Sequence, residues 1–143
     1  LTGLAMTMLV VSWEEMWFRG LPINYMAKRL PALAVCAFAS SIFVLMHGLN
    51  PSIVLWRAAP GLFLGGMCLS LSFFAFQSIW FPLGLHFAWN QFGDSLPLLF
   101  GVEFPDNRFW GENGIVPNFI LLAFAAALIN IVIKNTVRSN MRS

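Results

Sequence analysis

Three ionisable side chains lie close together in an otherwise apolar part of the chain: Glu14, Glu15 and Arg19. An ionisable residue at membrane depth costs at least ~2.5 kcal/mol, so it is usually paired and usually functional. Glu15 and Arg19 are four residues apart, in the acid-before-base order that favours an ion pair on a helix. Glu14 is turned by about 100° from Glu15 and has no local partner. Two interpretations stay open: both acids share Arg19 and fix helix packing, or Glu14 is free for chemistry.

The chain has two histidines, and both lie in apolar stretches rather than in polar loops. His47 follows Phe43 by four residues, so imidazole and phenyl ring share one helix face. His86 precedes Asn90 by four residues, with the same consequence. A single histidine in an apolar helix is more often a packing residue than a catalytic one. Because His86 has a polar companion and no histidine lies in a loop, we expect both to contribute to a shared site.

These residue types fit amide hydrolysis in two ways. In one, Glu14 and His47 activate water. His86 and Asn90 then donate hydrogen bonds to the developing oxyanion. In the other, Glu14, His47 and His86 are ligands of a zinc ion that keeps an open position for water. The chain lacks the HExxH motif of the usual zinc-protease helix, and the sequence leaves metal-dependent and metal-free mechanisms equally open.

The composition places these residues in a membrane protein. The chain of 143 residues is 59% hydrophobic and 10% charged, with a mean hydropathy of +0.76. Ordinary soluble domains carry about 25% charged residues. The net charge of +2 is small and the basic residues are scattered, so we expect no nucleic-acid partner. The chain begins with Leu, and no cationic region precedes its first apolar run; this indicates no signal peptide and a fragment that lacks N-terminal residues.

We predict that an all-α, polytopic transmembrane helical bundle positions the site. The length of the chain leaves room for roughly five spans of ~20 residues. Hydropathy places these segments at residues 1–25, 31–49, 60–76, 79–92 and 117–133. Pro60 is expected at the first position of its helix, where proline is favoured. We predict a single transmembrane domain over residues 1–143, with its catalytic core in residues 13–91.

The basic residues predict the orientation of this bundle. Lys28 and Arg29 follow the first segment, and three basic residues follow the last one. The positive-inside rule therefore puts both of these regions in the cytoplasm, with Arg57 as the exception.

This simple topology separates the two histidines in depth. It places His47 near the outer end of its segment and His86 about two turns from the inner end of its own. A single site then requires that the segment at 79–92 be broken, tilted or re-entrant, or that the segment at 31–49 extend beyond Pro51.

Taken in order, three short motifs resemble those of the CPBP family of CAAX proteases and bacteriocin-processing enzymes, also called Abi. The motifs are Glu14-Glu15-xxx-Arg19, Phe43-xxx-His47 and His86-xxx-Asn90. Their order and spacing match, and the resemblance covers about residues 13–91. It implies a multi-pass intramembrane endopeptidase of the cell membrane that acts on membrane-embedded or lipidated peptides and proteins. The family's eukaryotic branch trims prenylated CAAX termini, and many bacterial members are linked to bacteriocin maturation or self-immunity.

The resemblance also implies a role for each motif residue. Glu14 is the catalytic acid that activates water, and His47 is its partner. His86 and Asn90 complete the site. An orienting role falls to the remaining motif residues, which are Glu15, Arg19 and Phe43. The family is often labelled metalloprotease, with a metal bound by Glu14, His47 and His86, although a metal-free, glutamate-type mechanism has also been proposed for it.

Two functions from other classes stay open. The chain is a non-catalytic immunity or scaffold protein of the membrane if the motifs form only a polar packing cluster. It is a proton or ion carrier if Glu14 and the two histidines form a relay.

Overall fold

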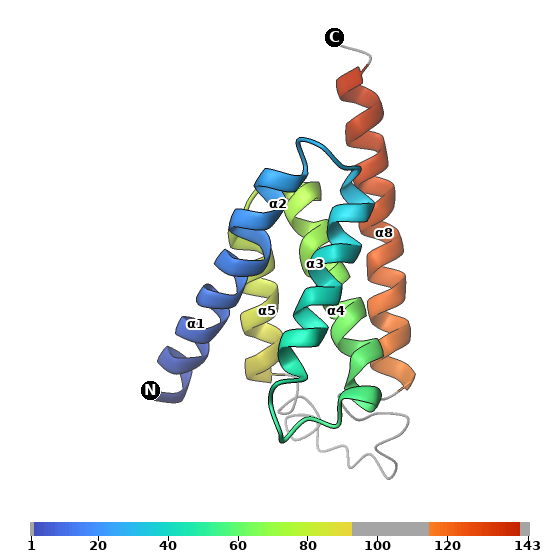
Figure 1. Cartoon of the computed structure of the whole chain (residues 1–143). Helices are drawn as coiled ribbons and strands as arrows, with labels where there is room; N and C mark the ends of the chain where they lie inside the picture. Colours follow the sequence, from blue (N-terminus) through green and yellow to red (C-terminus); the bar gives the residue numbers. More distant parts are fainter. Residues whose placement is uncertain (1, 93–114, 141–143) are drawn as a thin grey trace.

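The computed structural model describes residues 2–92 and 115–140, and every element in these residues is a helix. In chain order they are α1 (Thr2–Glu15), the π-helix η1 (Met16–Gly20), α2 (Leu21–Met26), α3 (Ala32–His47), α4 (Leu55–Phe76), α5 (Trp80–Phe92) and α8 (Ile115–Asn140) (Figure 1). The predicted all-α bundle is confirmed. The elements follow the apolar runs of the sequence, because a long apolar run can satisfy its backbone hydrogen bonds within a helix.

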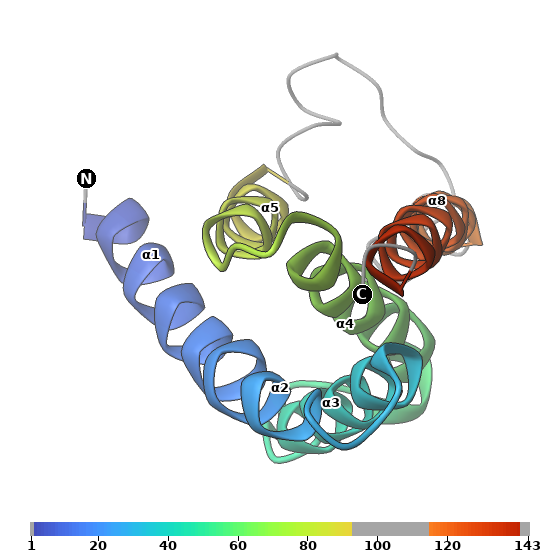
Figure 2. The same ribbon diagram turned by 90° about the horizontal axis from the view of Figure 1, so that it is seen from above.

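Helix α4 is the centre of the bundle and packs against α3, α5 and α8. Seen from above, α1 to α4 follow a curve, and α5 stands between α1 and α4 (Figure 2). The apolar core lies between α3, α4 and α8 and contains both cysteines as free thiols. Its buried members are Cys36, Cys68, Leu71, Ala75, Leu121, Ala125, Leu128 and Val132.

Small residues bring α3 and α4 close together. A Cβ atom added at Gly66 would lie 3.1 Å from the Cβ and 3.2 Å from the Cα of Ser40. The Ser40 hydroxyl donates to the carbonyl of Cys36 at 2.7 Å, so this buried polar group is satisfied. Close backbone approach through small residues is the usual way in which helices pack in membranes. It fixes the level of α3 relative to α4.

The predicted start of the third segment at Pro60 is wrong. Helix α4 begins five residues earlier, at Leu55, and Pro60 lies inside it. A proline in a helix removes the hydrogen bond to the carbonyl four residues before it, here that of Trp56. This hydrogen bond is lost within the first turns of α4. The apolar and alanine-rich residues on both sides of Pro60 remain helical. The last helix also runs beyond the predicted end at residue 133, to Asn140.

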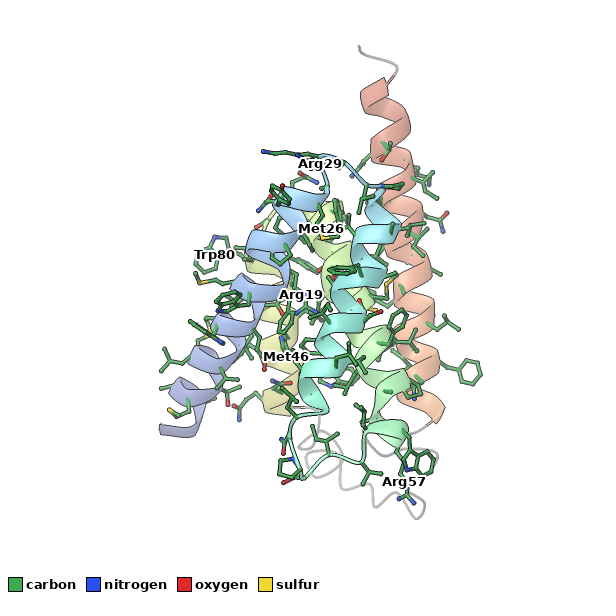
Figure 3. All side chains as sticks on the ribbon, viewed as in Figure 1. Arg19, Met26, Arg29, Met46, Arg57 and Trp80 are labelled. Carbon is green, nitrogen blue, oxygen red and sulfur yellow. The ribbon has the colours of Figure 1, made fainter. Side chains whose placement is uncertain are left out.

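Two of the described helical stretches are long and apolar enough to cross a membrane: Leu55–Phe76 and Asn118–Thr136. Helix α3 is apolar but shorter. The count of five spans therefore stays a prediction. Arg29 and the C-terminal end of α8 lie at one end of the bundle, whereas Arg57 lies at the other (Figures 1 and 3). Of the basic residues after the last segment, Arg142 is outside the described residues.

Candidate active site

The first part of the site forms where α1 passes into the π-helix η1. Glu14 and Glu15 end α1, and Arg19 lies in η1. Single π-helical turns inside longer helices are frequent at functional sites. Oε1 of Glu15 and Nη1 of Arg19 are 2.8 Å apart, and neither side chain has any exposed surface. The predicted ion pair between these two residues is confirmed.

This buried pair is held against α3 by an aromatic ring. The guanidinium carbon of Arg19 lies 4.8 Å from the ring centroid of Phe43. A cation above an aromatic ring is attracted by the ring's quadrupole, and the attraction grows where water is excluded. The ion pair thus fixes η1 against α3, and loss of either partner would leave an uncompensated buried charge.

His86 lies between the two adjacent glutamates. Its Nδ1 atom is 2.8 Å from Oε1 of Glu15, and its Nε2 atom is 3.5 Å from Oε2 of Glu14. A carboxylate only accepts hydrogen bonds, so Nδ1–H of His86 donates to Glu15. Glu15 therefore contacts His86 as well as Arg19. The two acids do face different directions, but an imidazole has nitrogens on two edges, so one ring meets both acids.

His47 is oriented by its own helix. Its Nδ1 lies 2.9 Å from the carbonyl oxygen of Phe43, one turn earlier. Because this oxygen can only accept, Nδ1 carries the proton, and Nε2 of the neutral ring keeps a lone pair. The ring centroid of Phe43 is 4.2 Å from that of His47 and 5.9 Å from that of His86. Phe43 thus contacts both imidazoles.

The predicted separation of the two histidines in depth does not occur. Helix α3 ends at His47, two residues before the predicted end of its segment, and α5 runs without a break from Trp80 to Phe92. The reason is the level at which α5 begins. Trp80 lies well below Arg29 and nearer the level of Arg19 (Figure 3). His86, six residues further along α5, is therefore displaced toward the end of the bundle at which α3 ends.

A cavity of about 700 Å³ opens beside these residues. It lies among α1, α3, α4, α5 and α8. Five predicted site residues line it: Glu14, Phe43, His47, His86 and Asn90. Gly61 and Gly65 of α4 face it as well, and a Cβ at Gly65 would meet no atom within 4 Å. The close approach of α4 to α3 is made by the next residue, Gly66.

Two of the three orienting residues, Glu15 and Arg19, lie behind the cavity wall, whereas the third, Phe43, lines the cavity. Glu15 and Arg19 are fully buried and contact His86 and Phe43 rather than the cavity. The structure therefore divides the predicted residues into those that could touch a substrate and those that hold them in place.

The zinc site predicted at Glu14, His47 and His86 stays a prediction. Among the described residues, no group of three or more His, Cys, Asp and Glu side chains is placed to hold one ion. Nδ1 of His86 is bound by Glu15, and Nδ1 of His47 is bound by the Phe43 carbonyl. These contacts leave Nε2 as the nitrogen of each ring that can accept a hydrogen bond or bind an ion.

One charged residue of the lining was not predicted as part of the site. Arg57, in the first turn of α4, borders the same cavity. From the sequence it was only the exception to the orientation rule. The sequence did contain one signal: Arg57 is a single cationic residue next to the apolar segment at residues 60–76.

A family model described as "Type II CAAX prenyl endopeptidase Rce1-like" matches residues 1–92 of the chain. The match includes all three motifs and the helices α1 to α5 that carry them. No curated protein and no solved structure matches the chain.

Proposed function

Because the chain belongs to the Rce1-like family of type II CAAX prenyl endopeptidases, a family of membrane-embedded proteases, we propose that it hydrolyses a peptide bond of a lipidated substrate in the cavity beside Glu14. One observation carries this proposal. Glu14, His47 and His86 come from three different helices and line the same cavity. A purely structural polar cluster would not need a cavity large enough for a peptide segment.

Glu14 is the proposed base that activates water. Its carboxylate takes a proton from the water molecule whose oxygen attacks the carbonyl carbon. Nε2 of His47 accepts the second hydrogen bond of this water, because its lone pair is free while Nδ1–H is bound to the Phe43 carbonyl. The pair thus orients and polarises the nucleophile.

His86 is the proposed proton relay. Glu15 fixes its Nδ1–H, much as a buried acid fixes the histidine of a hydrolytic triad. Nε2 faces Oε2 of Glu14 at 3.5 Å, so a proton taken up by Glu14 can pass through this contact. When the carbon–nitrogen bond breaks, the leaving amine takes up this proton. The second hydrogen of the water stays on the new carboxylic acid, which loses it to solvent and leaves as the carboxylate.

Asn90 is the proposed oxyanion donor. It lies one helical turn beyond His86 on α5 and lines the cavity. Its side-chain amide carries two N–H donors and no charge. Donors placed where negative charge develops are typically worth 10²- to 10³-fold in rate, roughly, in acyl transfer.

In these steps only side chains of the chain itself move protons. The mechanism is therefore proposed as glutamate-type. The alternatives of bacteriocin processing and self-immunity concern which lipidated or membrane-bound peptide enters the cavity, and they would share these steps.

We further propose that the helices cross a cell membrane several times, with the basic end of the bundle in the cytoplasm. The helical stretch from α1 through η1 to α2 covers residues 2–26, enough for one span. Arg29 and the end of α8 lie at the same end of the bundle, as the positive-inside rule requires (Figures 1 and 3).

The proposed function is tested with the purified chain in liposomes and a fluorogenic peptide that carries a prenylated cysteine near its C-terminus. We expect cleavage directly after the prenylated cysteine, identified by mass spectrometry, and slow cleavage of the same peptide without the prenyl group. Absence of cleavage, together with a change in a pH gradient across the liposomes, would instead favour the proton carrier.

A further inference from the structure

The cavity contains a cationic side chain for which the catalytic steps have no use. Among the described residues that line it, Arg57 is the only lysine or arginine. No carboxylate of the described residues pairs with it. Several of its neighbours in the lining are apolar, such as Ile53, Val54 and Leu62. A lone cation on an apolar wall is suited to bind an anionic group of whatever enters the cavity.

The guanidinium is held in a way that leaves its donors free. Its carbon lies 4.9 Å from the ring centroid of Trp56. An aromatic ring attracts the cation but accepts none of the hydrogen bonds of its N–H groups. These groups therefore stay available to bind a carboxylate. Arg57 is thus positioned without being neutralised.

The level of Arg57 along the bundle can be placed from the contact between Gly66 and Ser40. Arg57 is nine residues before Gly66 on α4, which is about 14 Å along the helix axis. Phe43 is three residues after Ser40 on the antiparallel α3, or about 5 Å in the same direction. Arg57 therefore lies about 9 Å beyond Phe43, toward the end of the bundle at which α4 begins (Figure 3).

This spacing matches the end of a CAAX substrate. In such a terminus three residues follow the lipidated cysteine, and the last one carries the free carboxylate. Three extended residues span about 10 Å. A scissile bond beside Phe43, whose ring contacts both His47 and His86, would place the terminal carboxylate at Arg57.

We propose that Arg57 binds the C-terminal carboxylate of the substrate peptide and thereby sets how many residues are removed. The inference rests on the proposed function, since it takes the reacting bond to lie beside His47 and His86. Arg57 is a specificity residue and takes no part in the proton transfers.

The test compares two prenylated peptides of identical sequence, one ending in a free carboxylate and one in a carboxamide. Binding is measured by fluorescence anisotropy in nanodiscs of neutral lipid, for the wild type and for Arg57→Gln. We expect the wild type to bind the carboxylate peptide about tenfold more tightly. Arg57→Gln should bind both peptides with the affinity that the wild type has for the carboxamide.

Arg29→Gln is the matched control. Arg29 is also exposed and also lies against an aromatic ring, 5.4 Å from that of Tyr25, but at the other end of the bundle. This variant should keep the full preference for the carboxylate.

Two results would overturn the assignment. One is a wild type without preference, or an Arg57→Gln variant that keeps it. The other is an effect of Arg57→Gln that is equal for both peptides and appears only with anionic lipid, which would assign Arg57 to a lipid phosphate. Cleavage of the carboxamide peptide separates this question from the proposed function. Cleavage without a binding preference removes the role of Arg57 alone, and a binding preference without cleavage removes the protease mechanism alone.

Discussion

Nδ1 of His86 lies 2.8 Å from Oε1 of Glu15, and this contact joins two residues that are 71 positions apart in the chain. It connects α5 to the end of α1 and fixes which nitrogen of the imidazole faces the cavity. The same carboxylate oxygen also pairs with Arg19 at 2.8 Å. One buried acid therefore sets the positions of a helix, a π-turn and a candidate proton relay.

Replacing Arg19 with Met should destabilise the fold, because Glu15 would be left as an uncompensated buried charge. Removing one partner of a buried pair typically costs about 3–5 kcal/mol. The double variant Glu15→Gln/Arg19→Met should recover part of the free energy of unfolding, measured by denaturation in detergent micelles. Lys134→Met, at an exposed position of α8, should stay within about 0.5 kcal/mol of wild type. A double variant no better than the additive loss would argue against a coupled pair.

Three single variants, each with leucine in place of a glycine, should give three different outcomes. Gly65→Leu should fill the cavity and abolish cleavage without loss of stability, since a Cβ there meets nothing within 4 Å. Gly66→Leu should lower the free energy of unfolding, because its Cβ would press on the backbone of Ser40. Gly84→Leu is the control for helix propensity, because a Cβ at Gly84 meets nothing within 4 Å and Gly84 does not line the cavity. Full activity in Gly65→Leu would show that substrate does not use the cavity.

Asn90→Ala should lower kcat with little change in KM, because an oxyanion donor acts only in the transition state. The expected loss is roughly 10²-fold. Asn130→Ala is a matched control, since Asn130 is exposed on α8 and donates to the carbonyl of Ala126 in its own helix. A rise in KM at unchanged kcat would instead assign Asn90 to ground-state binding of the substrate.

The helices, and the residue pairs that share a helix face, could be predicted from the sequence because both depend on local signals. Apolar runs marked the helices, and the four-residue spacings of Phe43 with His47 and of His86 with Asn90 marked shared faces. The start of α4 was misplaced because the preference of proline for a first position outweighed the continuing apolar sequence before Pro60.

The geometry of the site could not be predicted in the same way. That His86 meets both Glu14 and Glu15 depends on how α5 packs against α1, which no local pattern specifies. The depth of the histidines depended on where α5 begins relative to the other helices. Arg57 was overlooked because no local pattern shows that the start of α4 lines the same cavity as Glu14, His47 and His86.

The most direct test of hydrolysis at Glu14 is the cleavage rate of a prenylated peptide by purified Glu14→Gln. Glutamine keeps the size of the side chain but cannot take up the proton of the attacking water. We expect kcat/KM to fall by about 10³-fold or more, with circular dichroism and the unfolding midpoint like those of the wild type. A Glu14→Gln protein that cleaves at the wild-type rate would contradict the assignment of Glu14 as the base.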